Sequence, residues 1–260
     1  MMSDTPHIEI LFFDVGNVLV SDDPSALFIY RRLFDHLHAS QDGDAPTAEK
    51  FFEYRTTFTQ KGGMLWDFVS HVLGEGLARR FQMATRRDLY HEWEKYSPAI
   101  PSMEQAVQTL YKEGWRLGIL ANQPPEVERL LRARKLWDLF EVHAVSDVLG
   151  FSKPDPRLFQ RALEKAGVAA ARSLMIGDRV DNDVAPAKAL GMRTMQICLD
   201  AKTRGWEPDD DFARAYFESV SKCNVSGRAP ANADETPDYV VRSADELVSV
   251  IRGLRPPDSN

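Results

Sequence analysis

Short, nearly continuous apolar runs recur along the chain and alternate with segments whose apolar residues follow helical spacing. The first run extends from Ile8 to Phe13 and leads directly into Asp14. Such a run, bounded by turn residues, is typical of a strand that is buried on both faces of a parallel sheet. Gly16 and Asn17 follow, and both tolerate the left-handed backbone that a sharp turn requires. The pattern therefore predicts an early strand with Asp14 at its carboxyl end.

Further apolar runs of this kind occur in the second half of the chain, mostly separated by helical segments. They predict strands at residues 115–120, 140–145, 173–176, 192–199 and 238–241. Strands that alternate with helices form right-handed β-α-β units, and these units build a mostly parallel sheet. We therefore expect an α/β fold.

A long segment without strand signals separates the first predicted strand from the second. Between residues 25 and 96 the apolar positions recur at helical spacing, and turn residues and prolines flank this block. We expect residues 22–98 to form an all-helical cap that acts as a lid over the site containing Asp14. Residues 1–21 and 99–260 would form the core.

A polar stretch rich in Asp, Gly and Pro occupies residues 200–237. It is long for a connection between elements of an α/β domain. Residues 211–220 could form a helix within it. We expect a surface excursion without a strong functional role.

The composition removes several functional classes. A formal net charge of −7 over 260 residues gives a nucleic-acid partner no electrostatic support. Two cysteines, Cys198 and Cys223, suggest neither a disulfide framework nor a zinc site. Residues 1–6 lack the features of a signal peptide, and no apolar run approaches the length of a membrane span. We expect a cytoplasmic protein without a nucleic-acid or membrane partner, and the sequence leaves its oligomeric state open.

Segments with candidate chemistry follow four of the predicted strands. They are Asp14 after the first strand, Ala121-Asn122 after the second, Lys153 on the loop after the third, and Gly177-Asp178 after the fourth, with Arg179, Asp181 and Asp183 close behind. Ligands of open α/β sheets bind outside the carboxyl ends of the strands. We therefore expect these segments to meet in one site.

The residue types in this group suit a magnesium ion and phosphoryl chemistry. Two or three carboxylates, with a backbone carbonyl and waters, match the ligands of Mg²⁺, a hard ion that keeps several of its waters. Lys153 would offset the repulsion between the carboxylates and bind a phosphoryl oxygen. An aspartate beside a metal and a lysine can attack phosphorus and form an aspartyl-phosphate, while the metal neutralises the transferred group.

Four motifs of the chain resemble those of the haloacid dehalogenase-like (HAD) hydrolase superfamily. They are FFDVGNVL at residues 12–19, GILANQ at 118–123, GFSKPDPRLF at 150–159 and MIGDRVDND at 175–183. The resemblance covers about residues 8–20 and 100–250. It implies a doubly wound, mostly parallel, Rossmann-like sheet with a helical cap inserted after the first motif.

The resemblance also implies roles for individual residues. Asp14 would be the nucleophile and a Mg²⁺ ligand, and Gly16 would offer its backbone carbonyl to the metal. Lys153 would fix the nucleophile and the phosphate, and Asp178 would hold Mg²⁺ directly. Asp183 would be a metal residue that acts through a water or an outer contact, with Asp181 as a weaker candidate for that place. Beside Lys153, the residues expected to face the substrate are Asn17, Ala121 and Asn122.

Two positions depart from the pattern of a phosphatase of this superfamily. Gly16 stands where a second aspartate usually acts as general acid and base, a function that contributes ~10²–10⁴-fold to rate. Ala121 stands where Ser or Thr usually donates a hydrogen bond to the phosphoryl group, and losing one such donor costs ~10²–10³-fold. Hydrolysis of an alkyl phosphate should therefore be slow. A substrate with a good leaving group, such as an anomeric sugar, aryl or acyl phosphate, would still be hydrolysed because it needs little protonation. Alternatively, Asn17, Asn122 or a cap residue could orient the attacking water.

Three functions remain open from the sequence. The first is Mg²⁺-dependent hydrolysis of a small phosphorylated metabolite through an aspartyl-phosphate on Asp14, which the retained nucleophile, lysine and metal acid favour. The second is a HAD-fold binding or regulatory protein with little or no turnover, suggested by Gly16 and Ala121. The third is a 2-haloacid dehalogenase, which needs neither an acid at position 16 nor Mg²⁺. In that case Asp178 and Asp183 would have no purpose, and the aromatic residue that such enzymes place two positions after the nucleophile is absent.

Overall fold

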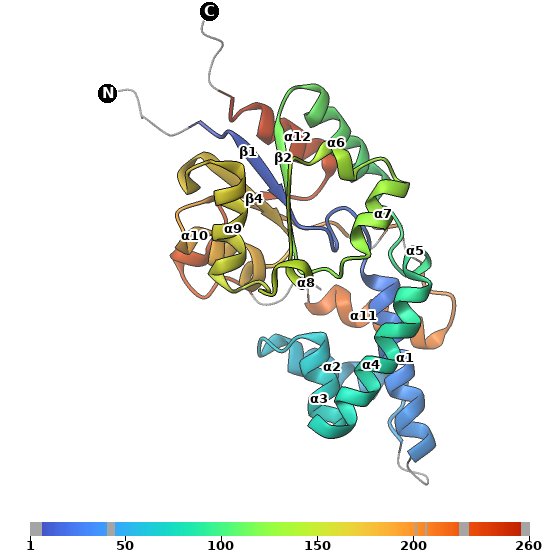
Figure 1. Cartoon of the computed structure of the whole chain (residues 1–260). Helices are drawn as coiled ribbons and strands as arrows, with labels where there is room; N and C mark the ends of the chain where they lie inside the picture. The colour runs from blue at the N-terminus through green and yellow to red at the C-terminus, as the bar shows by residue number, and fades with distance from the viewer. Residues whose placement is uncertain (1–6, 41–44, 201, 206, 224–228, 256–260) are drawn as a thin grey trace, which may run out of the picture. The chain divides into compact units, whose positions relative to one another are not determined.

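The chain forms two units when its residues are grouped by their mutual contacts. The core unit comprises Met1–Val20, Ala99–Asp200 and Ala229–Asn260, and the helical unit comprises Ser21–Pro98 and Ala201–Arg228. The structure is a computed structural model (Figure 1) that describes residues 7–40, 45–200, 202–205, 207–223 and 229–255.

A six-stranded, fully parallel sheet forms the centre of the core unit. Its strands are β1 (Ile10–Phe13), β2 (Arg116–Ala121), β3 (Val142–Val145), β4 (Ser173–Gly177), β5 (Arg193–Ile197) and β6 (Tyr239–Val241). Their order in the sheet is β3-β2-β1-β4-β5-β6. The strands predicted from the apolar runs are thus confirmed, with ends that differ by one or two residues. All four residues of β1 are fully buried, as expected for a strand covered on both faces.

The strand order reverses at β1, which pairs with β2 on one side and with β4 on the other. In open α/β sheets the crevice outside the carboxyl ends of the strands at such a switch point is the usual place for a ligand. The sheet topology therefore indicates that a ligand would bind near the residues that directly follow β1, β2 and β4.

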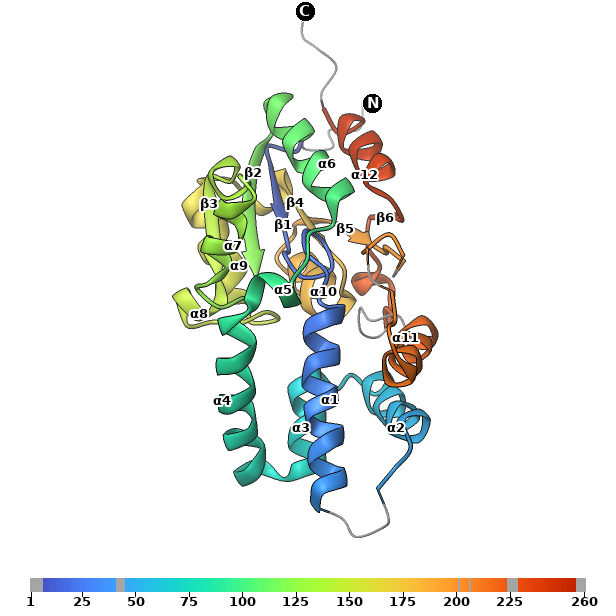
Figure 2. The ribbon, with the colours of Figure 1, turned by 90° about the vertical axis from the view of Figure 1, so that its right-hand side faces the viewer.

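Helices cover both faces of this sheet, as the first two views show (Figure 1, Figure 2). On one face α9 (Pro156–Ala166) packs against β2 and β3, and α10 (Ala185–Ala189) packs against β5. On the other face α12 (Ala244–Arg252) packs against α6 (Pro101–Lys112). The other helical segments of this unit are α7 (Val127–Ala133), α8 (Ser146–Leu149), η1 (Trp137–Leu139), η2 (Ala170–Arg172), η3 (Val180–Val184) and η4 (Ala233–Glu235). This doubly wound α/β arrangement confirms the predicted fold class.

The helical unit is built around a cluster of aromatic rings. Its helices are α1 (Asp23–Ser40), α2 (Ala48–Gln60), α3 (Leu65–Leu73), α4 (Glu75–His91), α5 (Trp93–Tyr96) and α11 (Asp211–Cys223). The ring of Tyr30 lies edge-on to those of Phe51, Phe52 and Phe68, with centroids 5.9–6.2 Å apart. These aromatic residues, which follow helical spacing in the sequence, therefore form the core of the unit. Within the described residues, no helix is both long and apolar enough to cross a membrane.

Residues 201–228 differ from the expectation that they would form a surface excursion of the core. The helix predicted at residues 211–220 is present as α11, but it packs against α2 and α1. Phe212 and Tyr216 on α11 join the aromatic cluster, where each contacts the ring of Phe52. Because α11 covers the apolar face of α2, this segment groups with the helical unit and not with the core unit.

A buried ion pair holds the segment before α11 to the start of α1. Asp23 is fully buried, and one of its carboxylate oxygens lies 2.8 Å from Nε of Arg204. The hydroxyl of Tyr216 donates a hydrogen bond of 3.1 Å to the other oxygen. Burial, together with the nearby Asp23 carboxylate, raises the pKa of Tyr216 well above its ordinary value. The network therefore joins parts of the helical unit that are far apart in the sequence.

The ion pair predicts a large and non-additive loss of stability. The substitution Asp23→Asn removes the carboxylate charge that faces the buried guanidinium of Arg204, which should lower the free energy of unfolding by about 3–5 kcal/mol. The double variant Asp23→Asn with Arg204→Met removes both charges, so its loss should be smaller than the sum of the two single losses. Urea denaturation followed by circular dichroism measures these free energies.

The matched control is the exposed ion pair of Arg31 and Asp210, which also connects α1 to the segment before α11. Its atoms lie 2.7 Å apart, and the two side chains are 38% and 45% exposed. Asp210→Asn should change the free energy of unfolding by less than about 1 kcal/mol. Equal losses for Asp23→Asn and Asp210→Asn would contradict the importance of the buried pair.

Candidate active site

Asp14 is the first residue after β1, at the switch point of the sheet. Its backbone N–H continues the sheet ladder by donating to the carbonyl of Ile176, at 2.9 Å. The chain then turns sharply, and the N–H groups of Val18, Leu19 and Val20 all donate to the carbonyl of Val15. Asn17 adopts a left-handed backbone with φ of 53°, which an asparagine tolerates. The turn predicted from Gly16 and Asn17 is therefore present, and it leaves the Asp14 side chain at the carboxyl edge of the sheet.

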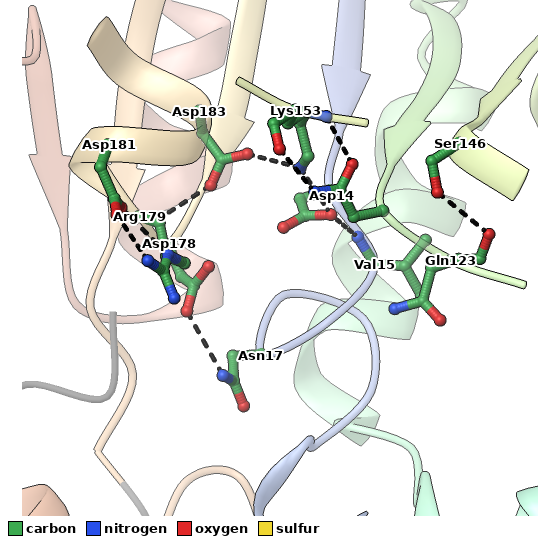
Figure 3. A network of polar contacts seen from close by, with 11 residues as sticks. Asp14, Val15, Asn17, Gln123, Ser146, Lys153, Asp178, Arg179, Asp181 and Asp183 are labelled. Atoms are coloured by element: carbon green, nitrogen blue, oxygen red, sulfur yellow. Dashed lines mark hydrogen bonds and ion pairs between the residues drawn. The ribbon is translucent and has the colours of Figure 1, made fainter. Parts of the chain in front are cut away.

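Lys153 lies between two carboxylates. Its Nζ is 2.9 Å from Oδ1 of Asp14 and 2.5 Å from Oδ1 of Asp183 (Figure 3). The ammonium is almost completely buried. Burial opposes its charge, but the attraction of the two carboxylates outweighs that effect and raises the pKa of Lys153. Lys153 is therefore a charged group fixed in the centre of the site.

Asn122 positions the backbone of Lys153. Its side-chain Oδ1 accepts a hydrogen bond of 2.7 Å from the N–H of Lys153, and its Nδ2 donates one of 2.9 Å to the carbonyl of the same residue. Both ends of the Asn122 amide are thus engaged by the loop that carries the lysine. The sequence predicted that Asn122 would face the substrate, and in the structure its side chain binds this loop.

Asp183 is completely buried, and each of its carboxylate oxygens has a partner. Oδ1 binds Lys153, and Oδ2 accepts a hydrogen bond of 3.0 Å from the backbone N–H of Arg179. Gly177 makes this approach possible, because a Cβ at that position would lie 2.3 Å from the carboxyl carbon of Asp183. A glycine at position 177 is therefore a steric requirement of the site.

Asp178 is held through both its side chain and its backbone. Its Oδ2 accepts a hydrogen bond of 3.3 Å from Nδ2 of Asn17, and its carbonyl accepts one of 3.0 Å from Nε2 of Gln196 on β5. The sequence analysis did not identify Gln196, whose signal is a polar amide in the predicted strand at residues 192–199. Asp181 turns away from this group, because Arg179 binds both of its oxygens, at 3.0 and 2.5 Å.

Three carboxylates meet in a way that suits a divalent cation. Asp14, Asp178 and Asp183 each offer one oxygen, and these oxygens lie within 4.8 Å of one another. Lys153 balances one of the three carboxylates, and the nearby Arg179 is paired with a fourth, Asp181, so the group keeps an excess of negative charge. Oxygen ligands with this net charge match Mg²⁺, which binds through few carboxylates and keeps several waters. The donor set therefore fits a magnesium ion.

The ionisation of Asp14 depends on the charges around it. Burial raises the pKa of Asp14 to about 6, Lys153 acts in the opposite direction, and Asp183 adds to the rise. Oδ1 of Asp14 accepts hydrogen bonds from Lys153 and from the N–H of Val15, at 2.8 Å for the latter. Among the described residues no group donates to Oδ2, so this oxygen remains available for a ligand.

The two positions that depart from the family pattern lie in the same site. Gly16 is in the turn after Asp14 and supplies no side chain, and Ala121 is fully buried at the end of β2. Position 16 therefore brings no carboxylate to the space in front of Asp14, and position 121 brings no hydroxyl.

Comparison with known proteins agrees with this arrangement. The family model for haloacid dehalogenase-like hydrolases matches residues 8–191. A glyceraldehyde 3-phosphate phosphatase of Pyrococcus furiosus is 35% identical over 198 residues, which cover 73% of this chain and 80% of that protein.

Solved structures show the same fold around different chemistries. A HAD phosphatase from Thermococcus onnurineus superposes with a TM-score of 0.61 and 19% identity over 95% of this chain and 99% of that chain. A 2-haloacid dehalogenase from Pseudomonas syringae superposes with a TM-score of 0.55 and 21% identity over 95% of this chain and 100% of that chain. The fold alone therefore does not choose between these reactions. From the family match and the similarity in sequence, we conclude that the chain belongs to the haloacid dehalogenase-like hydrolases.

Proposed function

We propose that this protein is a Mg²⁺-dependent phosphatase that hydrolyses a small phosphorylated metabolite through an aspartyl-phosphate on Asp14. The observation that carries the proposal is the placement of the Lys153 ammonium between Asp14 and Asp183, beside the third carboxylate of Asp178. The Pyrococcus relative, named a glyceraldehyde 3-phosphate phosphatase, supports the class of reaction.

Asp14 acts as the nucleophile through Oδ2 in this proposal. Oδ1 is fixed by Lys153 and by the N–H of Val15, so the carboxylate has a defined orientation. Oδ2 attacks the phosphorus atom, and the bond from phosphorus to the leaving-group oxygen breaks. Lys153 keeps Asp14 ionised and offers a positive charge to the phosphoryl oxygens. Water then hydrolyses the aspartyl-phosphate and releases inorganic phosphate.

The metal-binding residues in this proposal are Asp14, Asp178 and the backbone carbonyl of Gly16. When bound, Mg²⁺ supplies electrostatic stabilisation of the charge on the phosphoryl group. Both oxygens of Asp183 are engaged by protein donors, which supports an indirect role in which Asp183 holds Lys153 and the turn at Arg179. Asn17 and Gln196 position Asp178.

The residue at position 16 sets the kind of leaving group in this proposal. Without a carboxylic acid there, the leaving group departs as an anion. Anomeric sugar, aryl and acyl phosphates release stable anions, whereas an alkyl phosphate releases a strongly basic alkoxide. We therefore propose a substrate with a good leaving group, selected by the helical unit acting as the cap.

A second candidate is a binding or regulatory protein of the same fold with little or no turnover. Gly16 supplies no side-chain acid and Ala121 supplies no hydroxyl, and both features favour a binding or regulatory function. The buried lysine and three converging carboxylates favour catalysis, because a binding protein has no need of an oriented nucleophile.

The substitution Asp14→Asn should abolish phosphate release, with a loss of more than about 10³-fold, because the amide is no longer a carboxylate nucleophile. Release of phosphate from p-nitrophenyl phosphate in the presence of Mg²⁺ measures the effect. The matched control is Asp138→Asn, whose side chain is 78% exposed on the core unit and should leave the rate unchanged. Equal rates for wild type and Asp14→Asn across a panel of phosphorylated metabolites would refute the phosphatase and favour the binding protein.

A series of aryl phosphates tests the missing general acid. The kcat/KM of the wild-type protein, which reports formation of the aspartyl-phosphate, should fall steeply as the pKa of the leaving phenol rises, because position 16 supplies no acid to protonate the leaving oxygen. Gly16→Asp should flatten this dependence and raise the rate on alkyl phosphates by ~10²–10⁴-fold. A shallow dependence in wild type would show that another residue serves as the acid.

Binding of Mg²⁺ tests the assignment of the metal residues. Asp178→Asn should weaken Mg²⁺ affinity by at least about tenfold, since loss of even an outer partner of a metal costs ~10–100-fold. Asp181→Asn is the matched control, because Asp181 pairs with Arg179 outside the group of three carboxylates. The Mg²⁺ affinity of this variant should match that of the wild-type protein. Isothermal titration calorimetry with Mg²⁺ alone measures both. Equal weakening in the two variants would contradict the assignment.

A further inference from the structure

The β2 side of the site contains one side-chain donor that the mechanism above does not use. Ala121 has no polar side chain, and the amide of Asn122 is engaged by the backbone of Lys153. The next residue is Gln123, whose residue surface is only 7% exposed. Of these three residues that end β2 and follow it, only Gln123 has a side-chain N–H without a protein acceptor.

The backbone around Gln123 is firmly placed. Its carbonyl accepts a hydrogen bond of 3.3 Å from the hydroxyl of Ser146 and one of 3.4 Å from the N–H of Asp147. Pro124 and Pro125 follow directly, and proline restricts both its own backbone and that of the residue before it. A side chain on such a segment is presented in a restricted range of directions, as a pre-organised contact requires.

The amide of Gln123 is nearly buried and yet makes no hydrogen bond with the described residues. Neither of its polar atoms is among the fully enclosed side-chain atoms that lack a partner, so both retain contact with solvent. Gln123 follows β2 and Asp14 follows β1, and these strands pair in the sheet, so the two residues lie at the same carboxyl edge (Figure 3). A polar group that is largely removed from water without a partner carries a free-energy cost, which a ligand that accepts its hydrogen bond removes.

The distribution of charge in the site shows what such a donor could bind. In phosphoryl transfer the negative charge is spread over three equatorial oxygens, and donors are needed on more than one side of the group. Lys153 lies on the loop between α8 and α9, and Asp178, which the proposal assigns to the metal, directly follows β4. The residues that end β2 and follow it, Ala121, Asn122 and Gln123, carry no charge. Gln123 supplies a neutral donor there, and it does so without adding a titratable group.

We propose that Nε2 of Gln123 donates a hydrogen bond to the phosphoryl group during its transfer to Asp14, in the place of the hydroxyl that Ala121 lacks. This inference rests on the proposed phosphatase function. Gln123 is then a catalytic residue that compensates for the missing hydroxyl at Ala121. It acts only through a hydrogen bond, and no covalent bond to it forms or breaks.

The substitution Gln123→Met tests the proposal because it keeps the size of the side chain and removes the donor. It should lower kcat/KM for p-nitrophenyl phosphate by ~10²–10³-fold and raise the inhibition constant of vanadate, an analogue of the transferring group, by a similar factor. The thermal midpoint should match that of wild type. Gln105→Met, an exposed residue on α6, is the matched control and should change none of these quantities.

A rescue variant separates donation of a hydrogen bond from a structural role. Ala121→Ser in the Gln123→Met background restores a donor at the end of β2, and it should recover at least about tenfold in kcat/KM and in vanadate affinity. Wild-type kinetics and vanadate affinity in Gln123→Met, or a loss that Ala121→Ser does not recover, would overturn the role of Gln123 while leaving the phosphatase intact. Absence of Asp14-dependent turnover in wild type would overturn the proposed function and this inference together.

Discussion

The site depends on one buried cation, the ammonium of Lys153, held between the carboxylates of Asp14 and Asp183. Removing charges from water costs several kcal/mol per ion unless each finds a partner, so three converging carboxylates could not stay ionised here without it. Neighbouring features serve this contact. Asn122 fixes the backbone of the lysine, and Gly177 leaves the space that Asp183 occupies. The peptide N–H of Arg179 binds the second oxygen of Asp183, so that its carboxylate cannot rotate away.

Much of the core could be predicted because buried parallel strands leave a simple mark on a sequence. A strand covered on both faces must be apolar at almost every position, and the residue after it must turn. The four strand-end segments were therefore visible in the chain, and the parallel topology required them to meet at one edge. Asp14, Lys153, Asp178 and Asp183 do lie together. Their proximity followed from the fold, whereas their chemical roles came only from the residue types and the family resemblance.

The features that the sequence did not predict are those decided by distant partners. The helix at residues 211–220 was visible, but its amphipathic face does not say that Phe52 and Tyr30 will cover it. Likewise, the sequence shows that Asn122 has a side-chain donor but not that the backbone of Lys153 engages it. Gln196 escaped notice for the same reason, since its contact with Asp178 exists only when β5 lies beside β4. Packing therefore decides which polar side chains remain available for chemistry.

The absence of an acid at Gly16 acts differently on the two halves of the proposed reaction. In the first half the leaving group belongs to the substrate, so a stable anion can compensate fully for the missing proton donor. In the second half the leaving group is always the carboxylate of Asp14, which is already a stable anion and needs no proton. What the second half lacks is a base to activate water, and no choice of substrate can supply it. Selection of a good leaving group therefore moves the slow step toward hydrolysis of the aspartyl-phosphate, where the charge placed around Asp14 by Lys153 matters most.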